Sequence, residues 1–291
     1  MENWLPVKLL EEENALQWMR FDEQSFEEPF FDETIMRIRA KFPENRGRFR
    51  STTSLHLLCD QAASAAPPDL IIFHTSRCGS TLLAQLLGLD TGTAVLAEVP
   101  LLDQLLAAEA FSELCTVTHM LRRGKQKLVV KTDSWHLLHY ETLRRIWPEV
   151  PAVALYRHPA EILRSLRKQP GMQAVPGMLS PKQLPGVNPA QHPDPFFGEL
   201  MCAYFSKLIQ LRTTAPELLQ INYSEGALQM ASRTIAHAGF TLTPEQYAKL
   251  ETRARYNAKH PDIVFSEHEN EIVVSDYLIE AELLYNKLNQ L

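Results

Sequence analysis

One stretch, residues 69–88, constrains the fold more than any other part of the chain. Its sequence, DLIIFHTSRCGSTLLAQLLG, begins with the apolar run Leu70–Phe73, which is typical of a strand buried on both faces. Small and polar residues follow as far as Ser80, and after Thr81 leucines return at helical spacing. A strand, a tight turn and a helix start in this order direct several main-chain N–H groups and the positive end of a helix dipole at one point. Such a point binds an anion, most often a phosphate.

The turn is a poor match to the nucleoside-triphosphate loop G-x-x-x-x-G-K-[ST]. With Gly79 aligned on the second glycine, His74 stands in place of the first and Ser80 in place of the lysine. Arg77 lies inside the turn instead, followed by Gly79-Ser80-Thr81. This pattern resembles the 5′-phosphosulfate loop of sulfotransferases that use 3′-phosphoadenosine 5′-phosphosulfate (PAPS). The resemblance implies that the cofactor is held by the residues of this turn, namely Thr75, Ser76, Arg77, Cys78, Gly79, Ser80 and Thr81.

A second stretch, AVALYRHPAEILRS at residues 152–165, repeats the same organisation. A predicted strand, Val153–Tyr156, is followed by Arg157 and by a helix with Pro159 in its first turn, where the missing N–H costs nothing. Ser165 comes eight positions after Arg157, a little over two helical turns. In the sulfotransferases that this pattern resembles, such an arginine and serine hold the 3′-phosphate of the cofactor. The resemblance therefore assigns Arg157 and Ser165 to that phosphate, through guanidinium and hydroxyl donors.

Two further strands are predicted to end in ionisable residues. Residues 94–97 are followed by Glu98, and residues 128–130 by Lys131-Thr132-Asp133. Ligands of open parallel sheets gather outside the carboxyl ends of the strands, so these residues are candidates for catalysis. The K-T-D triplet resembles the K-T-H of cytosolic sulfotransferases, which implies that Lys131 stabilises the transferring group. Asp133 stands where that family places its basic histidine.

The identity of the general base stays open between three residues. Glu98 could accept a proton or could complement the dipole of the helix after it. Asp133 could act as base with a pKa raised by burial, although Asp-Ser before an apolar run favours a helix cap. His136 offers the imidazole that is the usual proton acceptor near pH 7, or a structural side chain.

Composition limits the class of protein. A chain of 291 residues with 45% hydrophobic and 22% charged residues is globular and large enough for a substantial core. A formal charge of −6 argues against a nucleic-acid partner. The four cysteines lack metal-ligand spacing, so no metal site is predicted. The N-terminus lacks the features of a secretory signal and no apolar run has the length of a membrane span, so we expect a cytoplasmic protein without a membrane partner.

Two regions are predicted along the chain: an N-terminal helical extension at residues 1–60 and a sulfotransferase-like domain at 61–291. Within the extension, residues 16–19 suggest a short helix and residues 30–42 an amphipathic one. Seven prolines make residues 169–198 a long loop, which is either a functional lid or disordered. As a lid it would border the acceptor pocket, with an apolar wall made of Met172, Met178, Phe196 and Phe197.

These patterns predict a three-layer α/β/α fold with a central parallel sheet, the P-loop-like sulfotransferase fold. The implied activity moves a sulfuryl group from PAPS to a hydroxyl or amine of a small-molecule or peptide acceptor, releases adenosine 3′,5′-bisphosphate (PAP), and needs no metal. One alternative is a P-loop kinase acting on a small molecule with ATP and magnesium. Another is a PAPS- or PAP-binding protein without catalysis, which Asp133 in place of a basic histidine suggests.

Overall fold

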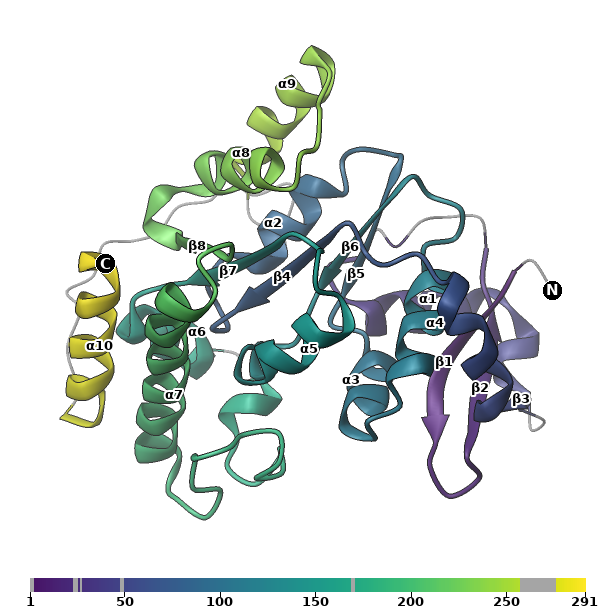
Figure 1. Ribbon diagram of the computed structural model, residues 1–291, viewed down its shortest axis with the longest axis horizontal. Coiled ribbons are helices and arrows are strands. Elements are labelled where there is room, and N and C mark those ends of the chain that lie inside the picture. The colour runs from purple at the N-terminus through teal and green to yellow at the C-terminus, as the bar shows by residue number, and fades with distance from the viewer. Residues whose placement is uncertain (1–2, 23–25, 27, 48–49, 169–170, 257–275) are drawn as a thin grey trace.

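The computed structural model describes residues 3–22, 26, 28–47, 50–168, 171–256 and 276–291 (Figure 1). Five parallel strands form its central sheet, in the order β5-β6-β4-β7-β8. They are β4 (Leu70–His74), β5 (Thr93–Ala97), β6 (Lys127–Lys131), β7 (Ala152–Tyr156) and β8 (Leu219–Asn222). Helices cover both faces of this sheet, so the predicted three-layer α/β fold with a central parallel sheet is confirmed.

The alternation of side chains along β4 explains the two helical layers. Leu70 and Ile72 point into one buried cluster, whereas Ile71 and Phe73 point into the other. Three helices supply the first cluster: α2 (Ser80–Leu87), α8 (Ala227–His237) and α9 (Pro244–Arg253). The second cluster is supplied mainly by α3 (Pro100–Ala107), α4 (Phe111–Leu121), α5 (Tyr140–Ile146), α6 (Pro159–Lys168), α7 (Pro193–Thr214) and α10 (Ile279–Gln290).

The strand order places a ligand site at the middle of the sheet. From β4 the chain passes to β5 and β6 on one side and then crosses to β7 and β8 on the other. Helices leaving the carboxyl ends in opposite directions open a crevice at this switch point, where α/β proteins bind their ligands. The register pairs Ile72 with Lys131 and His74 with Leu155, which aligns the carboxyl ends of the three central strands.

The N-terminal region is not the helical extension predicted from the sequence. It forms an antiparallel sheet of β1 (Trp4–Leu10), β2 (Ala15–Arg20) and β3 (Ser51–Ser54), so the helix predicted at residues 16–19 is wrong. Pairing with two distant segments decides the conformation of β2, and the Trp18 indole N–H donates to Thr53 Oγ1 at 2.8 Å. The amphipathic helix is present as α1 (Phe31–Lys41).

The small sheet packs against the main body of the protein. Leu9 and Leu16 belong to the same buried cluster as Leu101 and Leu105 of α3, and the Leu9 N–H donates to Gln104 Oε1 at 2.9 Å. A 3₁₀ segment, η2 (Leu55–Ser64), runs across the predicted boundary at residue 60. The division of the chain at that residue stays a prediction.

The described part of the proline-rich region contains one short 3₁₀ turn, η4 (Met172–Ala174), and ends earlier than predicted because α7 begins at Pro193. Phe196 and Phe197 lie in the first turns of α7 and are buried in the core, whereas Met172 and Met178 are largely exposed. The predicted apolar wall of an acceptor pocket is therefore wrong. Helix formation turned the two aromatic side chains inward onto the sheet.

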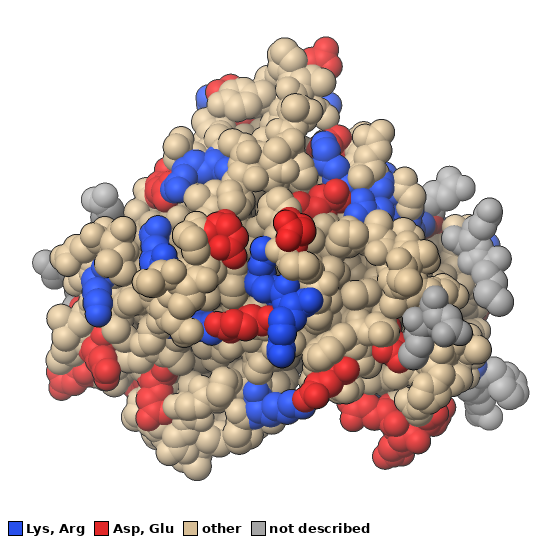
Figure 2. All heavy atoms as spheres, viewed as in Figure 1, with Lys and Arg blue, Asp and Glu red and all other residues tan. Residues whose placement is uncertain are grey.

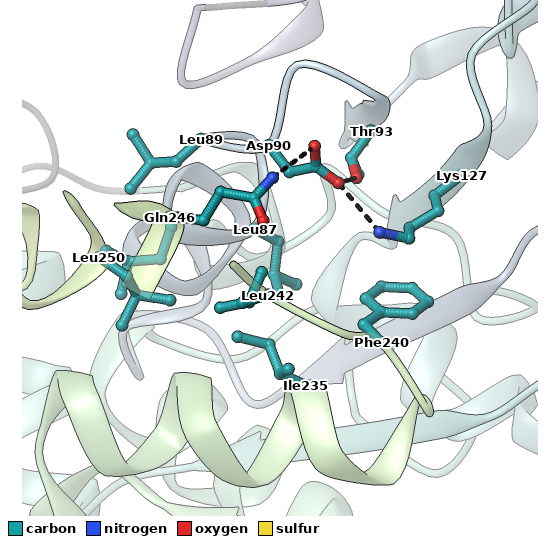
Figure 3. Close-up of a pocket in the computed structure, with 11 residues that line it drawn as sticks. Leu87, Leu89, Asp90, Thr93, Lys127, Ile235, Phe240, Leu242, Gln246 and Leu250 are labelled. Carbon is teal, nitrogen blue, oxygen red and sulfur yellow. Dashed lines mark hydrogen bonds and ion pairs between the residues drawn. The ribbon is translucent and has the colours of Figure 1, made fainter. Parts of the chain in front are cut away.

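A narrow seam separates α2 from α8 and α9 (Figure 3). Its polar group is Asp90, which accepts hydrogen bonds from Lys127 Nζ and Thr93 Oγ1 at 3.0 Å and from Gln246 Nε2 at 3.1 Å. The rest of the lining is apolar, and the free volume of about 10 Å³ holds no more than about one water. Thr93 and Lys127 are the first residues of β5 and β6, so this seam lies at the amino ends of the strands, opposite the crevice. It is a packing contact between helices and the sheet.

Charged side chains of both signs are interleaved on the face seen in Figure 2. Acidic ones gather over the turn that joins β1 to β2, where residues 11–13 are three consecutive glutamates. None of the helices within the described ranges combines the length and the apolar character needed to cross a bilayer.

Candidate functional site

Residues 75–81 form the turn between β4 and α2, here called the anion loop. Its backbone is left-handed at Ser76 (φ 66°), Arg77 (φ 47°) and Gly79 (φ 81°). Only glycine adopts this conformation without strain. At Ser76 and Arg77 it lowers the stability of the fold by roughly 1 to 2 kcal/mol each. Helix α2 begins at Ser80 without a side-chain cap on its amino end. The loop therefore presents the main-chain N–H groups of a helix start in a curved backbone, as an anion site requires.

Two buried side chains hold the anion loop in place. His74 Nδ1 accepts the N–H of Ser76 at 3.1 Å, so its Nε2 carries the proton and donates to the Thr132 carbonyl at 2.8 Å. The Cys78 thiol donates to the Leu155 carbonyl at 3.3 Å, and burial raises the pKa of this thiol. Cys78 thus fills space with its side chain, and it offers a ligand only its main chain.

The ring of Tyr223 covers the start of α2. A Cβ atom at Gly79 would lie 2.7 Å from two carbons of this ring, closer than packed atoms approach. Tyr223 opens η5 (Tyr223–Glu225) at the carboxyl end of β8, and the Arg157 guanidinium lies 4.2 Å from its ring centroid. Glycine is therefore required at position 79 for two reasons, the left-handed backbone and the contact with Tyr223.

Arg157 joins the two motifs that the sequence predicted separately. Its Nη1 donates to the main-chain carbonyl of Arg77 at 3.4 Å, and its Nε donates to Glu161 Oε2 at 2.6 Å. The turns after β4 and β7 thus meet at the crevice. Ser165 lies two turns further along α6 and is partly buried, and its contact with a phosphate stays a prediction.

Buried Lys131 and partly exposed Glu98 form an ion pair beside the anion loop. Lys131 is 1% exposed, its ammonium donates to Glu98 Oε1, and His74 Nε2 lies 3.6 Å from the same oxygen. Burial opposes the negative charge of Glu98, but Lys131 and His74 outweigh it and hold the pKa of this carboxyl below its usual range. Glu98 is therefore a poor proton acceptor and a good counter-ion. The ring of Phe30, from the N-terminal region, lies 5.4 Å from Lys131 Nζ.

Asp133 does not cap the helix that follows it, so the capping interpretation is wrong. It precedes η3 (Ser134–His139) without a capping hydrogen bond, and its carboxyl lies within hydrogen-bonding reach of the carboxyl of Asp103 on α3. Burial and the charges of Asp103 and Glu98 raise the pKa of Asp133 well above its usual range. Burial raises the pKa of Asp103 to about 7, with Glu98 and Asp32 adding to the effect.

His136 lies against this carboxyl pair and is buried. Its Nε2 is 3.0 Å from Asp103 Oδ1, yet neither ring nitrogen makes a well-directed hydrogen bond to any other described residue. Burial lowers the pKa of His136 to about 4, so the imidazole is neutral near pH 7. The three predicted candidates for the base thus fall into two groups, with Glu98 beside Lys131 and with Asp133 and His136 beside Asp103.

Sequence reasoning missed three residues of the site. His74 could have been noticed in the sequence, because it stands in place of the first glycine of a triphosphate loop. Its hydrogen bond from the Ser76 N–H is visible only in the structure. Gln173 donates from η4 to Ser76 Oγ at 2.7 Å, which places the proline-rich region against the anion loop. Asp103 sits in an apolar helical segment, and nothing in its surrounding sequence indicates a neighbour at position 133.

A metal centre is not evident in the ranges that the structure describes, where no group of three or more histidine, cysteine, aspartate or glutamate side chains is arranged to hold an ion. Comparison with known proteins gives likenesses of fold alone. No protein-family model matches the chain, and no curated protein matches it.

Among solved structures, the chain is similar to sulfotransferase STF9 from Mycobacterium avium, at 14% identity and a TM-score of 0.46, covering 81% of this chain and 79% of that one. It is similar to sulfotransferase STF1 from Mycobacterium tuberculosis at 14% identity and a TM-score of 0.48, covering 81% of each chain. It is also similar to mouse sulfotransferase SULT7A1 complexed with PAP, at 14% identity and a TM-score of 0.41, covering 81% of this chain and 90% of that one.

Proposed function

We propose that this protein is a sulfotransferase that moves a sulfuryl group from PAPS to an acceptor and releases PAP. One observation carries the proposal: the anion loop and Arg157, 80 residues apart, meet at the switch point of the sheet, where Arg157 Nη1 contacts the Arg77 carbonyl. A loop with main-chain N–H donors at a helix start, next to a planar guanidinium, fits a ligand with two anionic groups. PAPS carries such groups at its 5′ and 3′ positions.

Two cationic side chains of the site are already held by carboxylates. Glu161 binds Arg157, and Glu98 binds Lys131. A 3′-phosphate would compete with Glu161 for the Arg157 guanidinium, while the anion loop would hold the phosphosulfate. Both carboxylates keep the cations oriented before the ligand arrives, which lowers the entropy that binding has to overcome.

The chemistry requires stabilisation of charge on the oxygen that bridges phosphorus and sulfur. As the sulfur–oxygen bond breaks, this oxygen becomes part of the departing phosphate. The N–H groups of the anion loop and the ammonium of Lys131 lie at the carboxyl edge of the sheet. They are the donors that would stabilise the negative charge on this oxygen. Glu98, with its lowered pKa, stays ionised as the partner of Lys131 and holds it in place.

A thermal-shift comparison tests the proposal. PAP without metal, at about 100 times its dissociation constant, is expected to raise the melting temperature by roughly 5 °C or more, because such binding adds about 2.7 kcal/mol. Adenosine 5′-monophosphate is the matched control without the 3′-phosphate, and it should stabilise less. Stabilisation by ATP with magnesium and none by PAP would favour the kinase. Transfer of labelled sulfate from PAPS to an alcohol, phenol or amine then separates the enzyme from a protein that only binds PAP.

A further inference from the structure

A large cavity lies beside Asp103, one of the two residues of the carboxyl pair. We call it the α3 cavity, and its volume is about 500 Å³, which suits a small organic molecule. It lies between α3, the η3–α5 segment and the proline-rich region. Its lining consists of Glu11, Asp103, Gln104, Leu106, Ala107, Glu109, Phe111, Trp135, His139, Thr142, Arg145, Ser180, Lys182 and Gln183.

Asp103 connects this cavity with the proposed sulfuryl site. It also lines a second, much smaller hollow of about 20 Å³, together with Lys131, Thr132 and His136. The side chain of Asp103 is 21% exposed, so a molecule in the α3 cavity can reach its carboxyl. His136 borders the smaller hollow, and among the described residues its two buried ring nitrogens make no well-directed hydrogen bond, although Nε2 lies 3.0 Å from Asp103 Oδ1. A buried imidazole whose one near polar neighbour is an accessible carboxyl, at 3.0 Å without a well-directed hydrogen bond, is typical of a functional site.

Resting on the sulfuryl transfer proposed above, we propose that the α3 cavity binds the acceptor and that the Asp103 carboxylate removes the proton from its hydroxyl group. Asp133 is then a positioning residue: it keeps its own proton and donates a hydrogen bond to Asp103. In the transfer, the acceptor O–H bond breaks and its proton goes to Asp103. The acceptor oxygen bonds to sulfur, and the bond from sulfur to the bridging oxygen breaks with its electron pair left on the 5′-phosphate of PAP.

Charges around the pair support this division of roles. Asp133, Glu98 and His136 face Asp103, Asp32 acts on it from α1, and Lys131 borders the same small hollow. Two adjacent carboxyls share a proton because both cannot ionise together. With a pKa of about 7, Asp103 is matched to proton transfer near neutral pH, whereas His136, with a pKa of about 4, is roughly a thousandfold weaker as a base.

The lining of the α3 cavity indicates the class of acceptor. Three carboxylates, of Glu11, Asp103 and Glu109, outnumber two cations, of Arg145 and Lys182. Lys182 is bound to Glu109 at 2.9 Å. Aromatic side chains and uncharged polar groups make up much of the remaining lining. A neutral alcohol or phenol with both polar and apolar faces fits this cavity better than an anionic acceptor.

The test measures transfer of labelled sulfate from PAPS to a panel of neutral alcohols, phenols and methyl glycosides. Asp103→Asn is expected to lower kcat about 100-fold or more with an unchanged acceptor KM, and to remove the rise of rate through pH 7. Asp133→Asn keeps a hydrogen-bond donor and should lose less than about tenfold. The surface variant Asp194→Asn is the control. A larger loss in Asp133→Asn than in Asp103→Asn would make Asp133 the base and overturn the assignment.

A second pair of variants tests the cavity itself. Ala107→Trp fills the α3 cavity and is expected to raise the acceptor KM at least tenfold, whereas Ala108→Trp, at an exposed neighbouring position, should not. Equal activity in both would overturn the cavity as the acceptor site, and no sulfation of any neutral hydroxyl compound would overturn the acceptor class. PAP stabilisation is measured for each protein. Its absence in the wild type would refute the sulfotransferase premise, and its presence in the variants shows that they are folded.

Discussion

The Nη1 group of Arg157 lies 3.4 Å from the main-chain carbonyl of Arg77, although 80 positions separate the two residues in sequence. This contact joins the turn after β4 to the turn after β7. It follows from adjacency of the two strands, since His74 at the end of β4 pairs with Leu155 near the end of β7. Any ligand held by the anion loop therefore lies within reach of Arg157.

Replacement of Arg157 should weaken PAP binding far more than it weakens the fold. Arg157→Gln removes a charged, forked donor, and we expect a loss of about 10- to 100-fold in PAP affinity, as hydrogen bonds to charged groups contribute roughly 1.5 to 3 kcal/mol. Arg167→Gln on the exposed side of the same helix is the control and should bind normally. Isothermal titration with PAP measures both. Equal affinity in Arg157→Gln and the wild type would place the 3′-phosphate elsewhere.

The contact between Gly79 and Tyr223 predicts a difference between two glycine substitutions. Gly79→Ala forces a Cβ to within 2.7 Å of the tyrosine ring in a left-handed backbone, and should cost about 2 to 4 kcal/mol of unfolding free energy. Gly124→Ala has a similar φ of +70° with no atom within 4 Å, so it should cost only about 1 kcal/mol. Urea denaturation measures both values. If the two costs were equal, Tyr223 would not constrain the anion loop.

The ion pair of Lys131 and Glu98 should behave as a unit. Lys131→Met leaves the Glu98 carboxylate, which is 25% exposed, without its cation, and we expect a loss of about 2 to 4 kcal/mol, below that of a fully buried unpaired charge. Lys131→Met combined with Glu98→Gln removes both charges, so the double variant should be more stable than Lys131→Met alone. A double-mutant cycle by chemical denaturation gives the coupling energy. Additive losses would show that the two groups do not depend on each other for stability.

The raised pKa of Asp103 predicts a pH-dependent cost of folding. The folded protein holds the Asp103 proton up to about pH 7, whereas the unfolded chain releases it near the ordinary value of 3.8. Stability is therefore lost as pH rises between these values. Asp103→Asn removes this loss, so the variant should gain about 2 to 3 kcal/mol over the wild type between pH 5 and pH 8. Unfolding free energies at both pH values measure this gain. A difference that does not change with pH would mean that Asp103 ionises normally.

Much of the site could be predicted because its parts are local. A buried strand, a turn and a helix start occur within residues 69–88, and their order alone predicts an anion site at the turn. The same holds for Arg157 after β7, for Glu98 after β5 and for Lys131 at the end of β6. Parallel strands bring their carboxyl ends to one edge, so residues that follow such strands are predicted to be neighbours.

Other features depend on contacts that no local pattern contains. The spacing of apolar residues at 16–19 is compatible with a helix and with a strand. The segment forms a strand because it pairs with β1 and β3. The prolines before Phe196 and Phe197 predict a loop, yet α7 turns both side chains into the core. The secondary structure of both segments depends on burial against residues distant in the sequence, which outweighs the local helix or strand propensity.

The amino-acid sequence by itself determined the class of fold and the anion loop, because strand and helix periodicity and the chemistry of one turn are encoded within about 20 consecutive residues. Only the tertiary structure decided the state of the carboxyl groups. The sequence allowed Asp133 to cap a helix, but packing of α3 brought Asp103 against it, and burial raised the pKa of both carboxyls. A pKa depends on the solvent and charges around a group, and those are set by residues distant along the chain.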